Sequence, residues 1–318
     1  MSIRKWSGLG LVIAVLMCVS VSWAAQKKVL FIDAYHEGYA WSDGEVQGAK
    51  DTIGNKAEFK VIRMDTKRNG SEDFKKQAAL QVKAVIESYK PDVVIAADDN
   101  PSKYVIVPYY KDSNIPFVFI GVNWDASSYG FPWPNVTGVL EVSVVKPLIE
   151  MMRTYAKGDR LGFIGKDNET DRKEADNWTK KYGVALNTRF VNTFEEWKAA
   201  YKELNDQCDM LFVVNNAGIK DWNDAEAKAF VREVTKIPTS SSHDFIAPFV
   251  LIDYAKLAEE QGEIGAEIAL QILNGKSPKD IPVTNNKKGQ TYVNLPIAKK
   301  LGIKFTPQFL RSCKVINE

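Results

Sequence analysis

Apolar and polar positions along the first part of the chain alternate between strand and helix patterns. Short, nearly continuous apolar runs are typical of strands buried on both faces of a parallel sheet. Such strands are predicted at 28–33 (KVLFID), 59–64, 93–96 and 117–121. The intervening stretch 71–89 repeats its apolar residues at helical spacing, and Pro91 ends it. This order of strand, helix and strand predicts an α/β fold with a doubly wound parallel sheet.

Residues 121–138 interrupt this alternation and then it begins again. They hold Pro132, Pro134 and glycines among aromatic side chains, which is typical of a loop and a crossing point. The strands predicted beyond it are 160–164, 188–191, 210–214 and a short one after Pro238, and the helices are 147–155, 169–182, 193–205 and 221–235. The chain therefore predicts two α/β lobes with parallel-sheet cores, joined by a multi-strand hinge.

The stretch after residue 247 is too short for a third domain. It predicts a long amphipathic helix at 254–274, which ends at Asn274-Gly275, and a strand at 291–294. We expect lobe 1 to comprise 27–138 together with about 248–290, and lobe 2 to comprise 139–247. The segment 291–318 is expected to return across the hinge, and the pattern leaves open which lobe holds it.

The first 24 residues have the pattern of a signal peptide. Arg4 and Lys5 precede an apolar run, 9–21, whose length suits a signal-peptide core and is short for a membrane span. We expect cleavage after Ala24, with Ala25 as the alternative site. An uncleaved anchor is the other interpretation of this segment.

Cys18 raises the possibility of a lipid anchor. Met17 precedes it, where a lipid-attachment motif needs Gly, Ala or Ser, so we do not expect lipidation. No later segment is apolar for 18 residues, and the mature protein is expected to be exported and soluble.

Composition and charge restrict the possible partners. The chain has 42 Lys and Arg against 40 Asp and Glu, and Arg4 and Lys5 account for the whole surplus. A surface that follows phosphates needs a basic excess, so no nucleic acid partner is expected. Hydrophobic residues make up 45% and charged residues 26% of the chain, which is ordinary for globular proteins.

Histidine and cysteine are too few for an extensive metal or disulfide framework. The two histidines, His36 and His243, with scattered carboxylates predict no metal site. Cys208 and Cys313 remain after removal of the signal segment. In an oxidising compartment they would be able to pair, and the alternative is two small buried apolar residues.

Four stretches resemble the type I periplasmic binding proteins. They are VLFIDAYHEGYAWSDGEVQGAKDTI (29–53), PDVVIAADDNPSKYVIVPYYKDSNIPFVFIGVN (91–123), NVTGVLEVSVVKPLIEMM (135–152) and LAEEQGEIGAEIALQILNGKSPKDIPV (257–283), the last followed by VNLPIAKKLGIKFTPQFL (293–310). More narrowly, they are similar to the substrate-binding components of ABC transporters that include tryptophan and tyrosine uptake proteins. The resemblance implies two lobes, three crossings and a ligand held between the lobes.

The motifs YHEGYAWSDG and ADDN also resemble extracytoplasmic input domains of sensor kinases. The resemblance therefore leaves two functions open. The first is capture of a small polar, amino-acid-like ligand for the membrane subunits of an ABC transporter. The alternative is a periplasmic receptor that feeds a membrane sensor. In both cases we expect a periplasmic monomer without a cofactor.

Ligands of open α/β sheets bind beyond the carboxyl ends of the strands, and this rule selects the candidate contacts. In the first lobe the candidates are Tyr35, His36, Trp41, Asp98, Asp99, Asn100, Asn123 and Trp124, and in the second they are Asn168, Asn215, Asn216 and Asp244. Aromatic rings would stack on the ligand, and a carboxylate such as Asp98 would pair an ammonium group. The alternatives are structural roles, namely a helix cap for Asp99 or Asn100, a hinge aromatic for Trp124 and a turn for Asn215-Asn216.

Enzymatic motifs are not found. The chain has no Walker loop, GxSxG, HExxH or Rossmann GxGxxG sequence. Adjacent carboxylates such as Asp98 and Asp99 rarely point at one substrate atom, so we expect a binding protein and not an enzyme.

Overall fold

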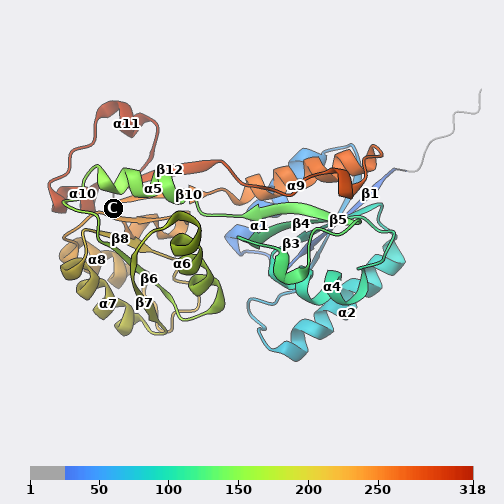
Figure 1. Ribbon diagram of the computed structural model, residues 1–318, viewed down its shortest axis with the longest axis horizontal. Helices are drawn as coiled ribbons and strands as arrows, with labels where there is room; N and C mark the ends of the chain where they lie inside the picture. The colour runs from blue at the N-terminus through green and yellow to red at the C-terminus, as the bar shows by residue number, and fades with distance from the viewer. Residues whose placement is uncertain (1–25, 318) are drawn as a thin grey trace, which may run out of the picture.

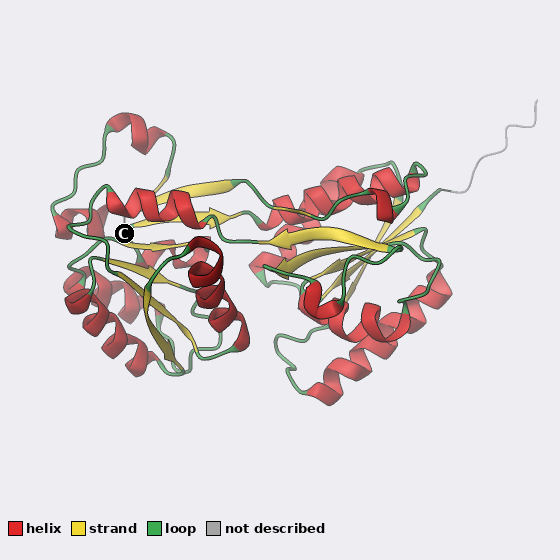
Figure 2. Ribbon diagram, in the orientation of Figure 1, coloured by secondary structure: helices red, strands yellow, loops and turns green. Residues whose placement is uncertain are grey.

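The computed structural model describes residues 26–317, which form two α/β lobes side by side along the long axis of the molecule (Figure 1). Each lobe has a central sheet with helices on both faces (Figure 2). The two-lobe architecture with parallel sheets confirms the predicted fold class. The predicted signal peptide lies outside the described residues. Between residues 26 and 317, no helix is long and apolar enough to cross a membrane.

The sheet of lobe 1 has six parallel strands in the order β11-β5-β4-β3-β1-β2. The strands are β1 (Lys28–Asp33), β2 (Glu58–Arg63), β3 (Val93–Ala97), β4 (Phe117–Asn123), β5 (Val136–Glu141) and β11 (Thr284–Asn285). Successive residues of a strand point to opposite faces, so each strand supplies two cores. Leu30 and Phe119 face the core covered by α2 (Glu72–Tyr89), whereas Phe31 and Ile120 face the core covered by α1 (Ala40–Ile53) and α9 (Ala258–Leu273).

Helices α1 and α9 pack unusually closely. A Cβ atom on Gly262 of α9 would lie 1.9 Å from the backbone oxygen of Glu45 in α1, and one on Gly48 would lie 2.1 Å from the oxygen of Glu259. Only glycine at these two positions permits this approach. The contact fixes α1, which carries Trp41, against the helix that follows the hinge.

The sheet of lobe 2 has seven strands in the order β13-β12-β10-β9-β8-β6-β7. The strands are β6 (Leu161–Lys166), β7 (Leu186–Val191), β8 (Met210–Val213), β9 (Thr239–Ser241), β10 (Ile252–Lys256), β12 (Gly289–Asn294) and β13 (Lys314–Ile316). All neighbours are parallel except β10 and β12. One face is covered by α5 (Val145–Arg153) and α6 (Glu169–Tyr182), and the other by α7 (Phe194–Gln207), α8 (Asp224–Val234) and α10 (Leu295–Leu301).

The chain crosses between the lobes three times, at 142–144, at 257 and at 286–288. The second crossing differs from the expected one near 248, because β10 belongs to the sheet of lobe 2 and the return to lobe 1 follows Lys256. The amphipathic pattern of α9 conceals this strand, since residues 254–256 extend the helical spacing. The C-terminal segment, including α11 (Pro307–Arg311), completes lobe 2.

Contacts of polar side chains join the three crossings. Asn286 accepts a hydrogen bond from the backbone N–H of Val142 at 2.8 Å and donates to its oxygen at 3.0 Å. Glu141 and Lys256, both buried, form an ion pair between the first and second crossings. The hinge is therefore a connected unit.

The two cysteines of the described chain are free thiols. Cys208 is buried at the end of α7, and Cys313 is half-buried after α11. The structure therefore contradicts a disulfide between Cys208 and Cys313.

Candidate functional site

The carboxyl ends of strands from both sheets surround a cavity of about 130 Å³ between the lobes. Lobe 1 and the crossing strand β5 supply Tyr35, Tyr39, Trp41, Lys67, Asp98, Asp99, Asn123 and Glu141, and lobe 2 supplies Asn168, Thr170, Asp171, Asn215, Ala217, His243 and Phe245. Because both lobes contribute to one cavity, closure of the lobes would enclose a ligand bound there.

Aromatic rings form much of the wall. The rings of Tyr35 and Tyr39 meet edge to face with centroids 5.2 Å apart, and the ammonium group of Lys67 lies 4.8 and 4.9 Å from their centroids. The ammonium group of Lys256 lies 5.8 Å from the centroid of the Trp41 ring. From lobe 2, Phe245 presents a side chain that is 36% exposed, which is unusual for a large apolar residue. Flat apolar surface from both lobes suits an aromatic ligand.

Asp98 supplies a buried carboxylate to the cavity. It directly follows β3 with φ of +69°, and its backbone N–H donates to the oxygen of Ile120 at 2.8 Å. The residue is 4% exposed, and its Oδ2 has no hydrogen-bond partner among the residues that the structure describes. Burial, followed by the charges of Glu141 and Asp99, raises the pKa of Asp98. A cationic group in the cavity would relieve this electrostatic cost.

Gly121 leaves room for the carboxylate of Glu45 and for the backbone of Asp98. Its φ is +67°, and a Cβ atom there would lie 2.7 Å from Oε1 of Glu45 and 3.3 Å from the backbone nitrogen of Asp98. Glu45 is fully buried, and within residues 26–317 neither of its carboxylate oxygens has a hydrogen-bond partner. Burial, with Asp98 as the largest charge contribution, raises the pKa of Glu45.

Asp99 and Asn123 line the cavity and also hold lobe 1 together. Asp99 Oδ1 accepts a hydrogen bond from the hydroxyl of Tyr129 at 2.7 Å, and Oδ2 lies 3.5 Å from Nδ2 of Asn123. Asp99 also begins the short helix α3 (Asp99–Pro101), which continues through a π-helical turn, Ser102–Ile106. Such turns are frequent at functional sites.

The facing wall of lobe 2 contains a second buried carboxylate, Asp171, in the first turn of α6. Its Oδ2 accepts from the backbone N–H of Lys166 at 2.7 Å, and its own N–H donates to Asn168 Oδ1 at 2.7 Å. The residue is fully buried, and its Oδ1 has no hydrogen-bond partner in the described part of the chain. Burial is the main cause that raises the pKa of Asp171 to about 7.

His243 and Asn215 complete the wall of lobe 2. Burial, followed by the charges of Lys256 and Lys67, lowers the pKa of His243 well below its ordinary value, so the ring is neutral at pH 7. Asn215 Oδ1 accepts from the backbone N–H of Ala217 at 2.9 Å, which is the turn contact of the alternative interpretation, although the residue still lines the cavity.

Two of the predicted contacts in lobe 1 lie behind the cavity wall. His36 Nδ1 lies 3.7 Å from Asp65 Oδ1. Asn100 Nδ2 donates to the hydroxyl of Thr66 at 2.7 Å. Both side chains hold the loops of lobe 1 together and are not part of the cavity lining.

Trp124 also lies outside the cavity and has the hinge role of the alternative interpretation. Its ring is 3% exposed and packs into the core of lobe 2, although it follows a strand of lobe 1. Its Nε1 donates to Glu174, which also accepts from Trp178 Nε1 at 2.8 Å. Lys181 donates to the backbone oxygen of Trp124 at 3.2 Å.

Asn216 and Asp244 of lobe 2 do not line the cavity. The backbone oxygen of Asn216 accepts from Ile219 in a turn. Asp244 is exposed, and its carboxylate accepts from the N–H of Phe245 at 2.8 Å. The backbone of Asn216 and the side chain of Asp244 thus hold loops whose neighbouring residues line the cavity.

Several lining residues were not among the predicted contacts. They are Tyr39, Lys67, Glu141, Thr170, Asp171, Ala217, His243 and Phe245. The carboxyl-end rule, applied also to β5, would have selected Glu141. Asp171 follows the cap residue Asn168 by three positions, and Phe245 follows Asp244 directly, so both lie just beyond the loops that the rule selected.

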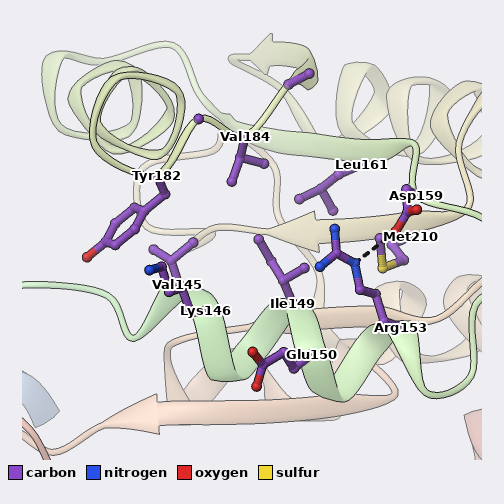
Figure 3. Close-up of a pocket in the computed structure, with 12 residues that line it drawn as sticks. Val145, Lys146, Ile149, Glu150, Arg153, Asp159, Leu161, Tyr182, Val184 and Met210 are labelled. Carbon is purple, nitrogen blue, oxygen red and sulfur yellow. Dashed lines mark hydrogen bonds and ion pairs between the residues drawn. The ribbon is translucent and has the colours of Figure 1, made fainter.

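A larger hollow of about 470 Å³ lies within lobe 2, between α5 and the end of α6 (Figure 3). Its floor includes Leu161 and Met210, which begin β6 and β8, so it lies at the amino ends of the strands. Its charged rim includes Arg153 and Asp159, which are exposed and paired with each other. Only lobe 2 contributes to this hollow, so lobe closure would not act on it.

No group of three or more His, Cys, Asp or Glu residues between 26 and 317 is arranged to hold a metal ion. The side chains that line the cavity include aromatic rings, amides, several carboxylates, the lysine Lys67, the imidazole of His243 and the hydroxyl of Thr170.

The two-lobe fold with parallel sheets is that of the type I periplasmic binding proteins. Residues 40–315 match the model of the family described as ABC transporter substrate binding protein. The chain therefore belongs to this family, whose members bind solutes and are not enzymes.

Individual relatives are distant. A tyrosine-binding protein of Clostridioides difficile is 26% identical over an alignment of 273 residues, and the alignment covers 81% of this chain and 73% of that protein. The open, ligand-free structure of a substrate binding protein with adhesive properties from Clostridium difficile has a TM-score of 0.69 at 20% identity, covering 91% of this chain and 99% of the other. An ABC domain in complex with L-Trp from Streptococcus pneumonia has a TM-score of 0.66 at 17% identity, with 92% and 100% covered.

Proposed function

We propose that this protein captures an aromatic amino acid in the interlobe cavity and delivers it to the membrane subunits of an ABC transporter. The observation that carries the proposal is the composition of one cavity, in which Tyr35, Tyr39 and Trp41 of lobe 1 face Phe245 of lobe 2 beside buried carboxylates. Aromatic surface would hold the side chain of the ligand, and the carboxylates would hold its ammonium group.

The charges of the cavity favour a zwitterion over a sugar. Lys67 is the cation that lines the cavity, and it would pair the ligand carboxylate. Neutral sugars carry no ammonium or carboxylate group with which these charged side chains would form ion pairs. The two distant relatives whose names mention tyrosine and L-Trp support the same ligand class.

The signal-like segment 1–24 supports a periplasmic location, and we propose that the protein works there as a monomer. Closure of the lobes on the ligand would create the surface that the transporter recognises. Closure is favoured only by contacts that the ligand makes to both lobes at once.

The test is a thermal-shift panel on purified mature protein, followed by calorimetry. The panel contains the twenty amino acids, nucleosides, sugars and polyamines. A ligand at 100 times its dissociation constant stabilises the folded state by about 2.7 kcal/mol, which is a shift of several degrees. We expect L-tyrosine or L-tryptophan to give the largest shift. A larger shift with a sugar or a nucleoside would refute the proposal.

A further inference from the structure

The cavity contains two buried carboxylates that come from opposite lobes and share one property. Asp98 of lobe 1 and Asp171 of lobe 2 both line it, at 4% and 0% exposure. Each has one oxygen, Oδ2 of Asp98 and Oδ1 of Asp171, without a hydrogen-bond partner within residues 26–317. Leaving a buried acceptor without a partner is costly, so each oxygen favours a donor placed in the cavity.

The position of Asp171 is fixed by its other contacts. Its second oxygen is held by the N–H of Lys166 at the end of β6, and its backbone by the cap residue Asn168. Thus the free oxygen belongs to a rigid element of lobe 2. Asp98 is equally fixed, because its backbone N–H is bonded to Ile120 of the neighbouring strand.

The charged groups that face Asp171 do not satisfy it. Glu174 on the same helix is a second acid and adds to the cost of ionising Asp171. Lys67, from the loop after β2, is the facing cation, and its ammonium group lies over the rings of Tyr35 and Tyr39. A donor from the ligand is the remaining way to use both free oxygens.

We propose that Asp98 and Asp171 bind the ammonium group of the ligand from opposite sides, so that Asp171 is the residue of lobe 2 that makes closure depend on a free amine. This inference rests on the proposed function and adds the residue that decides specificity. An ammonium group has three donors, so it is able to bond one oxygen of each carboxylate at the same time. A ligand without the amine gains the aromatic contacts but leaves both acids unpaired.

The experiment compares ligands that differ only in their charged groups. Calorimetry measures the affinity of wild type and Asp171→Asn for L-tyrosine, for 3-(4-hydroxyphenyl)propanoate, which lacks the amine, and for tyramine, which lacks the carboxylate. The corresponding tryptophan series is run in parallel. We expect Asp171→Asn to weaken L-tyrosine or L-tryptophan tenfold or more and to change the affinity of the deaminated compound less than twofold.

Glu169→Gln is the matched control. Glu169 belongs to the same first turn of α6 and carries the same charge, but it is exposed and does not line the cavity. We expect this variant to bind like wild type. If it weakens binding as much as Asp171→Asn does, the loss comes from removing a negative charge near the cavity and not from a contact between Asp171 and the ligand, and the inference is overturned.

Each outcome separates the inference from the function on which it rests. Binding of L-tyrosine or L-tryptophan with the same affinity in wild type and Asp171→Asn overturns the inference and leaves the proposed function intact. If wild type binds tyramine but neither amino acid, and Asp171→Asn does not bind tyramine, the result supports binding of an ammonium group by Asp171. The same result overturns the proposal that the ligand is an aromatic amino acid. No binding of any amine to wild type overturns both. If Asp171→Asn does not fold, equal affinity of wild type for L-tyrosine and its deaminated analogue overturns the inference, and a tenfold loss supports it.

Discussion

The acidic side chains around the cavity lie where burial and mutual repulsion oppose their ionisation. Asp98, Asp171 and Glu45 all have raised pKa values with burial as the main cause. The protein keeps them there although neutral residues would be less costly to bury. Strained electrostatics of this kind is typical of functional sites.

Replacement of Asp98 tests this directly. Asp98→Asn removes a charge but keeps the shape of the side chain, and we expect it to weaken an amine ligand tenfold or more, about 1.4 kcal/mol. Calorimetry measures the affinity, and Asp92→Asn, which lies at the opposite end of the same strand, is the control. Unchanged affinity would remove Asp98 from the site.

Asp171 is expected to make stability depend on pH. Its pKa is raised in the folded state from an ordinary value of 3.8 to about 7, so the folded protein binds more protons than the unfolded chain between these values. The contribution of this group is therefore fully present below pH 3.8 and is lost as the pH rises through 7. Glu174 adds to the shift, while Lys67, Asn168 and the N–H of Lys166 oppose it.

Thermal unfolding between pH 4 and 8 measures this effect. The melting temperature of wild type should fall as the pH rises through 7, and that of Asp171→Asn should fall less. At pH 8 we expect Asp171→Asn to be the more stable protein. Parallel curves for the two proteins would show that Asp171 ionises normally.

Sequence reasoning found residues that follow buried strands and missed those that depend on the partner lobe. Asp98 and Asn215 come directly after apolar runs, so their position at a strand end is visible in the sequence. Phe245 belongs to a short 3-10 helix, Asp244–Phe249, and its exposure to the cavity depends on where lobe 1 lies. No local pattern contains that information.

At the scale of elements, the approach of α1 to α9 sets the geometry of lobe 1. We expect Gly262→Ala to destabilise the protein by roughly 1–3 kcal/mol or more, because the added methyl group would meet the backbone oxygen of Glu45 at 1.9 Å. Urea unfolding measures the change. Gly70→Ala is the control, since nothing lies within 4 Å of its Cβ position, and it should stay within about 0.5 kcal/mol of wild type.

Elements with strong periodicity were predicted well, and those defined by tertiary pairing were not. Strand β1 has the predicted bounds, and Ser71 caps α2 through the N–H of Phe74. Strand β10 was missed because its residues continue the helical spacing of α9. The two-residue strand β11 and the strand β13 are defined by their pairing with β5 and β12, which the local sequence does not reveal.

At the scale of the whole molecule, the buried ion pair between Glu141 and Lys256 couples two crossings. Lys256→Met leaves Glu141 buried without a partner, and we expect a loss of roughly 3–5 kcal/mol in the free energy of unfolding. The double variant with Glu141→Gln should recover part of it. Asp159→Asn removes an exposed ion pair with Arg153 and should cost less than about 1 kcal/mol. If Lys256→Met and Asp159→Asn lower the free energy of unfolding by the same amount, the buried ion pair stabilises the protein no more than an exposed one.

The order in which the strands occur along the chain also bears on biosynthesis. Strand β11 joins the sheet of lobe 1 at residue 284, and β12 and β13 join the sheet of lobe 2 later still. A polypeptide that emerges amino end first therefore has no finished sheet until almost all of it has been made.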